Sequence, residues 1–221
     1  MDITEVIRTT FACRDFTDDP VSDETIARIL EHARFAPSGG NRQGWHVIVV
    51  RDPEIRAQIA ECAQRPARRY VAMQQAGEGP WNAAFPSSVT DESAANVRVP
   101  SRLYTTYIDA PVLLAIVVDL GVVASVDKEL DRVGVISGAS IYPFVWSVLL
   151  MARNEGLGGV LTTIPIAEEP RLKELLGLPD HYAVSAFLPI GKPVKQLSRL
   201  KRGPVEGFTT IDRFDGEAFP G

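Results

Sequence analysis

The segment that most restricts the possible fold runs from residue 133 to 152, VGVISGASIYPFVWSVLLMA, and contains no charged residue. Twenty apolar residues in a helix can cross a bilayer, so this segment must either enter a membrane or be buried within protein. A central proline, two glycines, three serines and the lack of a second such segment argue against the membrane. We therefore expect a buried helix that ends at Gly156, and no association with a membrane.

A helix that is apolar on every side needs cover on every side. One face can pack on the core of the same chain, and we expect a second subunit to cover the other. Gly134, Gly138 and Ala139 have no side chain or a very small one, which lets another helix approach closely.

Composition and charge exclude several classes of function. The 221 residues, 45% of them apolar, predict a single domain over 1–221 with its own core. The net charge of −5 argues against a nucleic-acid surface, so we expect a small molecule as the partner. Two cysteines and three scattered histidines predict no disulfide framework and no metal site. The acidic N-terminus shows no signal-peptide pattern, and we expect a cytoplasmic location.

Periodicity and turn residues predict a mixed α and β fold. Ser22 is the expected N-cap of the second of several helices, and the continuous apolar run at 110–120 is typical of a central strand. Residues 76–106, rich in Gly, Pro, Ser, Asn and Asp, form a lid-like excursion rather than a linker. The other expected helices are 2–10, 52–63, weakly 66–76, and 168–177, and the other strands are 45–50, 159–165 and 182–191.

The glycines at 156–159 do not form a dinucleotide-binding fingerprint. Leu161 occupies the place of the third glycine, and the order is helix then strand instead of strand then helix. Walker, Gly-x-Ser-x-Gly and His-Glu-x-x-His motifs are also missing from the sequence. The common nucleotidase and hydrolase signatures are therefore excluded.

Five segments in order along the chain resemble one family: IRTTFACRDF, APSGGNRQGW, GLGGVLTTIP, LPIGKP and LKRGP. The whole resembles the FMN-dependent nitroreductase family, within it the branch that includes iodotyrosine deiodinases. The resemblance implies an α+β, nitroreductase-like fold whose central, mostly antiparallel sheet is flanked by helices. It also implies an intertwined homodimer with FMN at each of two interface sites, reduced by NADH or NADPH.

The FMN phosphate is a dianion and needs fixed cations, for which guanidinium groups are suited. By motif position, the resemblance assigns this role to Arg14 and to Arg202, with Lys201 as support. The first part of the N-terminal motif departs from the family pattern. Arg8, together with Thr9 or Thr10, can substitute there only if the chain shifts locally.

The loop after the second helix is the expected flavin contact. The resemblance assigns Ser38 a hydrogen bond to the cofactor, with Pro37, Gly39 and Asn41 beside it; glycine lets backbone approach a flat ring. The alternative is an ordinary helix-to-strand turn, for which Pro-Ser-Gly-Gly needs no ligand. Gly44 stands where many relatives have proline, which predicts a looser loop.

The segment Leu161, Thr162 and Thr163 matches the family segment that runs past the flavin ring. The resemblance places a backbone N–H or a threonine hydroxyl near flavin N5, which would tune the redox potential. In the deiodinase branch such a hydroxyl accompanies one-electron chemistry. The alternative is a strand that favours threonine because of its branched side chain.

The reaction implied by the resemblance is a ping-pong cycle in which NAD(P)H reduces FMN and a nitroaromatic, quinone or similar acceptor reoxidises it. Because the cofactor carries the chemistry, we expect no catalytic acid–base pair. Alternatives are a non-catalytic flavin-sequestering or sensor protein, and an FMN-dependent reductive dehalogenase or ene reductase. Pro66 replaces the glutamate that deiodinases use for their substrate, although Tyr70 aligns with their tyrosine. Aromatic residues that could line a lid are Trp81, Phe85 and Tyr104.

Overall fold

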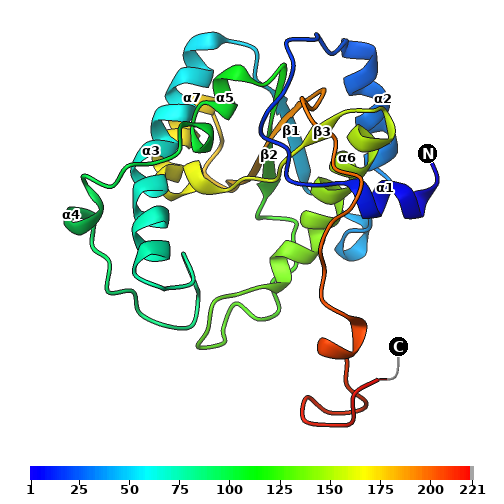
Figure 1. Ribbon diagram of the computed structural model, residues 1–221, viewed down its shortest axis with the longest axis vertical. Coiled ribbons are helices and arrows are strands. Elements are labelled where there is room, and N and C mark those ends of the chain that lie inside the picture. The colour runs from blue at the N-terminus through cyan, green and yellow to red at the C-terminus, as the bar shows by residue number, and fades with distance from the viewer. Residues whose placement is uncertain (220–221) are drawn as a thin grey trace.

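A computed structural model describes residues 1–219 and has an α+β fold around one antiparallel sheet (Figure 1). The strands are β1 (Trp45–Val49), β2 (Val112–Asp119), β3 (Gly158–Gly159) and β4 (Tyr182–Gly191). Their order is β1-β2-β4-β3, and every neighbouring pair is antiparallel. The expected central antiparallel sheet is confirmed.

Helices cover both faces of this sheet. They are α1 (Ile3–Thr9), α2 (Asp23–Ala33), α3 (Pro53–Gln75), α4 (Asp91–Ala94), α5 (Thr106–Asp109), α6 (Tyr142–Asn154) and α7 (Glu169–Leu176). Their ends follow local rules. The Ser22 hydroxyl accepts a hydrogen bond from the Thr25 amide at the start of α2, and Asp52 caps α3 in the same way.

The alternating side chains of β2 belong to two separate cores. Leu114 and Ile116 pack with α2 and α6 on one face, whereas Leu113 and Ala115 pack with α3 and α7 on the other. All four are at most 1% exposed. The apolar run at 110–120 is therefore a central strand, as expected, because both of its faces are buried.

The two helices expected at 52–63 and 66–76 form one helix, α3. Pro66 lies inside it. A proline removes one backbone hydrogen bond of the helix. Cys62, Pro66 and Ala67 are all buried, and this packing offsets the loss.

The strand expected at 159–165 is much shorter than predicted. After β3, pairing with β4 resumes only at Thr162 and Phe187, whose backbones exchange two hydrogen bonds of 3.0 and 2.9 Å. The Val160 amide donates to the Pro189 carbonyl at 3.3 Å. Proline has no N–H to return the second bond, so the ladder is interrupted there.

The uncharged segment is not one helix over its full length. Residues Ile136–Ser140 form a 3-10 turn, and α6 begins only at Tyr142 because Pro143 suits the first turn of a helix. Its end agrees with the expectation, since Gly156 follows with a φ of 81°. No helix within residues 1–219 has the length and apolarity needed to cross a bilayer.

Two segments extend from the body of the molecule. Residues 76–106 leave the end of α3 and return through α4 and α5, and residues from about 200 to 219 run outward from the body (Figure 1). Arg65 on α3 holds α4 through an ion pair of 2.7 Å with Asp91. That residues 76–106 act as a lid stays a prediction.

Candidate functional site

The N-terminal segment runs beside β3 at one edge of the sheet. Ala12 forms a parallel bridge with Gly159, and the Cys13 amide donates to the Gly159 carbonyl at 3.0 Å. A Cβ on Gly159 would lie 2.9 Å from Leu149 Cδ2, and one on Gly158 would lie 3.0 Å from Cys13 Cβ. Close packing thus requires both glycines. The pairing of the N-terminal segment with Gly159 brings Arg14 near the segment 161–163.

The backbone and hydroxyl groups of Thr162 all have hydrogen-bond partners within the protein. Its backbone pairs with Phe187, and its hydroxyl lies 2.9 Å from the hydroxyl of Tyr107. Tyr107 has no exposed surface, and burial raises the pKa of this phenol well above its ordinary value, opposed by the hydrogen bond from Thr162 and by the charge of Arg14. The next residue, Thr163, is exposed, and Leu161 is half-buried.

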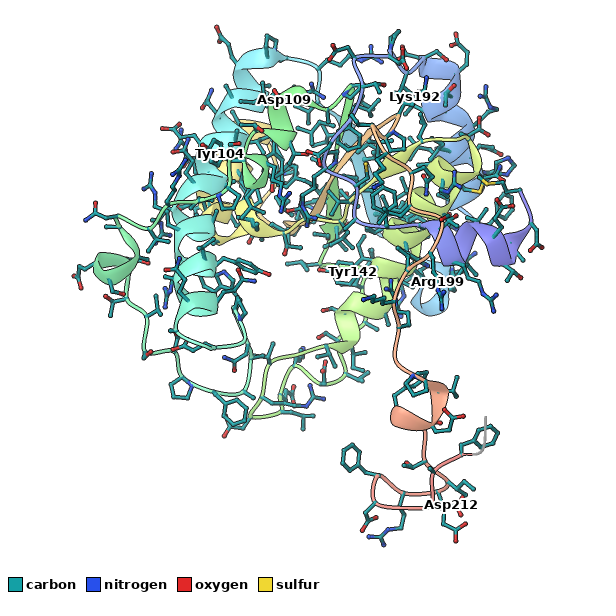
Figure 2. The ribbon with its side chains drawn as sticks, viewed as in Figure 1. Tyr104, Asp109, Tyr142, Lys192, Arg199 and Asp212 are labelled. Atoms are coloured by element: carbon teal, nitrogen blue, oxygen red, sulfur yellow. The ribbon has the colours of Figure 1, made fainter. Side chains whose placement is uncertain are left out.

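Two pockets lined by the segment after β4 contain several positively charged side chains. The first, of about 290 Å³, is lined by Arg14 together with Arg102 and Lys195, and by one carboxylate, Asp15. The second, of about 510 Å³, brings Arg8 and Arg202 together and adds Arg199. The segment after β4 lines both pockets, and Figure 2 shows Arg199 on it.

Three of these cations were missed from the sequence. Lys195 and Arg199 lie between the LPIGKP and LKRGP segments, so their position near two motif segments was an available signal. Arg102 had no such signal, because it lies in the irregular 76–106 excursion. Of the predicted phosphate contacts, Lys201 is exposed, and the Thr10 hydroxyl donates to the Val6 carbonyl at 2.7 Å.

The loop after α2 has an unusual backbone. Gly40, Asn41 and Gln43 have φ values of 61°, 52° and 50°. Two of these residues carry a side chain, and left-handed conformations of this kind gather at functional sites. Ser38 stabilises the loop, since its hydroxyl oxygen accepts from the Gln43 amide at 2.9 Å. The Gly39 amide in turn donates to the Ser140 hydroxyl at 3.0 Å.

The expectation of a looser loop was wrong. Gly44 is buried, and a Cβ there would lie 2.7 Å from Val122 Cγ2. Its carbonyl accepts from the Asp119 amide at 2.8 Å, and the Arg42 guanidinium donates to the Val122 carbonyl at 2.9 Å. Glycine lets the chain pack tightly at this point.

One chain does not bring the two predicted halves of the site together. The loop of Ser38 leads into β1, whereas Arg14 and Thr163 lie at the β3 edge. With the order β1-β2-β4-β3, three inter-strand spacings separate these edges, about 14 Å.

Comparison with known proteins identifies the family. The model of the nitroreductase family matches residues 7–192. The chain belongs to the nitroreductase family. The family expected from the five sequence segments is confirmed, and so is the nitroreductase-like fold.

Individual members of the nitroreductase family are similar over most of the chain. Iodotyrosine deiodinase 1 of Pongo abelii is 30% identical over 91% of this chain, which spans only 65% of that protein's length. Nitrobenzene nitroreductase of Ectopseudomonas oleovorans is 27% identical, with 95% of this chain and 96% of that protein covered. A crystal structure of iodotyrosine deiodinase bound to FMN and 3-iodo-L-tyrosine shares the fold with a TM-score of 0.67, 20% identity, and 96% and 98% coverage.

Proposed function

We propose that this nitroreductase-family protein is an FMN-dependent oxidoreductase that takes electrons from NADH or NADPH and passes them to a small organic acceptor. The observation that carries the proposal is the clustering of cations in two pockets that the segment after β4 lines, one containing Arg14 and the other Arg8 and Arg202. Arg8 and Arg14 belong to the first motif segment and Arg202 to the last. Such a clustering of cations in a chain of net charge −5 is the pattern expected for a bound phosphate.

The residues present fit FMN in two respects. Six cations line the two pockets against a single carboxylate, which suits a phosphate dianion. The buried Oε1 of Gln196 has no hydrogen-bond partner within residues 1–219, although its amide donates to the Thr9 carbonyl at 3.0 Å. Such an acceptor suits a hydroxyl of the ribityl chain.

At the flavin ring, we assign the contact near N5 to Thr163 in preference to Thr162. The Thr162 backbone and hydroxyl already have partners, whereas Thr163 is exposed beside them. Bound FMN supplies the electron transfer. The protein's part is to hold the ring, offer hydrogen-bond donors, and admit donor and acceptor in turn.

The second half of the site would come from a partner copy in a homodimer. Its loop of Pro37, Ser38, Gly39 and Asn41 would meet Arg14 of the first copy, since one chain keeps them at opposite sheet edges. The Ser38 hydroxyl accepts from the Gln43 amide and keeps its hydrogen for a ligand.

Exposed apolar surface supports this homodimer. An open pocket of about 880 Å³ lies beside α6, and Tyr142 and Trp146, both lining it, are 42% and 43% exposed. Figure 2 shows Tyr142 at the start of α6. On the C-terminal segment, Phe208 and Phe214 are 73% and 100% exposed. Apolar patches of this kind mark an interface, and the outward course of this segment suits an intertwined dimer.

Reductive dehalogenation is the second candidate, favoured by the likeness to iodotyrosine deiodinase 1. At the aligned positions on α3, however, Pro66 is buried and carries no carboxylate, and only Tyr70 remains of the deiodinase pattern. This departure favours a different acceptor, such as a nitroaromatic compound or a quinone.

The first experiment is an anaerobic titration of the FMN-loaded protein with NADPH and then with NADH, followed by the visible flavin spectrum. Bleaching supports the reductase and identifies its donor. A bound flavin that stays oxidised favours the sequestering or sensor function. Failure to bind FMN would overturn the proposal.

A further inference from the structure

A pocket of about 610 Å³ lies between α3 and the segment that precedes α5. Gln64 and Arg68 line it from α3, four residues apart and so on one face of the helix. Arg98, Ser101 and Tyr104 line it from the other side, and Figure 2 shows Tyr104 beside α3. Its volume is in the range of small-molecule sites.

Arg68 differs from the other arginines of α3. Arg56 donates to the Ile108 carbonyl at 3.1 Å, Arg65 pairs with Glu168 at 2.6 Å, and Arg69 lies 3.6 Å from Asp91 and stacks on Trp81. Arg68 is half-buried and makes no ion pair or side-chain hydrogen bond with any residue in 1–219.

Arg98 also makes no ion pair within the described part of the chain, and it is exposed at the mouth of the same pocket. None of the described residues that line the pocket is Asp or Glu. Two guanidinium groups without a counter-charge therefore face one cavity, in a protein with an excess of acidic residues. Guanidinium groups in this situation bind carboxylate or phosphate.

The remaining walls of the pocket are apolar or aromatic. Val97, Val99, Pro100 and the ring of Tyr104 supply them. Such surfaces suit a flat ring, while the two arginines suit an oxyanion attached to it.

The pocket adjoins the candidate flavin site. The 3-10 turn Ser101–Leu103 contributes Ser101 to this pocket and Arg102 to the pocket of Arg14. One short turn thus separates the two cavities. A ligand held here by its anionic end would lie next to the Arg14 end of the candidate flavin site.

We propose that Arg68 and Arg98 form an oxyanion-binding subsite for the ligand that reacts at the flavin, and that this ligand carries a carboxylate or phosphate on a planar ring system. The role of the ligand at the flavin rests on the proposed function, whereas the binding of an anion by the two arginines does not depend on that function. Two sources share the chemistry: the 2′-phosphate of NADPH and the carboxylate of an aromatic acceptor.

The test is isothermal titration of the FMN-loaded protein with two anionic probes and their uncharged counterparts. Adenosine 2′-monophosphate with adenosine represents the reductant, and 4-nitrobenzoate with nitrobenzene represents the acceptor. We expect one anionic probe to bind at least 10-fold more tightly than its uncharged counterpart, and R68Q and R98Q each to weaken it about 10- to 100-fold. R51Q, at an exposed arginine paired with Asp23 on the surface, is the matched control and should leave binding unchanged.

Tight binding of the phosphate probe assigns the subsite to the reductant, and tight binding of the carboxylate probe assigns it to the acceptor. Equal binding of charged and uncharged probes, or binding unaffected by R68Q and R98Q, would overturn the proposal. If R68Q does not fold, the exposed Arg98 still provides the test. Loss of FMN binding is visible in the flavin spectrum and concerns the proposed function alone, because the probe titration can still be read on the same chain.

Discussion

The hydroxyl groups of Tyr107 and Thr162 lie 2.9 Å apart in the core, where both side chains are buried. This pair joins α5 to the segment that leads into Thr163. It orients Thr162 inward and leaves Thr163 as the residue that faces outward.

Replacing Tyr107 by Phe should destabilise the protein by about 1–3 kcal/mol, because the buried Thr162 hydroxyl would lose its partner. Thermal unfolding of the variant measures the loss. The double variant Tyr107→Phe, Thr162→Val removes both polar groups and should recover part of this stability. Independent, additive effects of the two substitutions would contradict the pairing.

Thr163→Val should change the midpoint potential of bound FMN and the amount of flavin semiquinone seen during photoreduction. The reason is that the proposed hydrogen bond near N5 would be lost. Thr162→Val is the matched control, and it should lower thermal stability while leaving the flavin potential unchanged. If Thr162→Val changes the midpoint potential of bound FMN and Thr163→Val does not, our assignment would be reversed.

Arg14→Gln should weaken FMN binding about 10- to 100-fold, because a charge-assisted hydrogen bond contributes about 1.5–3 kcal/mol. Fluorescence quenching of FMN during titration measures the dissociation constant. Arg202→Gln should act in the same direction, and raised salt should reduce the difference from the wild type. Unchanged affinity in both variants would remove the two arginines from the site.

Trp146→Glu should convert the proposed dimer to a monomer that no longer retains FMN, because it places a charge on the apolar face of α6. Light scattering coupled to size-exclusion chromatography gives the oligomeric state, and absorbance at the flavin band gives the occupancy. Trp146→Phe keeps the surface apolar and should remain dimeric. A monomeric Trp146→Glu variant with full FMN occupancy would show that one chain suffices.

Asp127 should make the loop before α6 sensitive to acid. Its carboxylate accepts from the Val135 amide at 2.8 Å and pairs with Arg132, and these contacts lower its pKa from 3.8 to about 2. Because the pKa of Asp127 is lower in the folded state than in the unfolded chain, its carboxylate stabilises the fold at pH values above the unfolded pKa near 3.8. This stabilisation is lost as the pH falls toward 2. Acid unfolding followed by fluorescence should show a smaller loss of stability from pH 4 to 2 in Asp127→Asn. An identical acid profile would contradict this role.

Local sequence patterns predicted most of the helices and strands, because the formation of these elements depends on residues that are neighbours in sequence. The N-cap at Ser22, the central strand β2 and the strand at 182–191 follow from a capping side chain and from apolar runs. Prediction failed where distant residues intervene. Pro189 interrupts the strand expected at 159–165, and the burial of Pro66 keeps α3 continuous.

The candidate site could be predicted only in part. Motif position assigned Arg14, Ser38 and Thr163 to the candidate site, and the fold leaves all three at least partly accessible. No pattern indicated Arg102 or Arg68, because a pocket forms from segments whose approach depends on the packing of the whole chain. The contacts of glycines 158 and 159 with Cys13 and Leu149, which explain the need for glycine at both positions, also depend on this packing.

The sequence by itself determined the family and the order of the main elements, and it indicated the motif segments of the candidate site, because these depend on local composition and spacing. Only the tertiary structure decided which threonine faces outward and that the loop of Ser38 and the side chain of Arg14 lie at opposite edges of the sheet. The physical reason is strand register and strand order. They are set by hydrogen bonds and packing between residues far apart in sequence, and a side chain's direction follows from them.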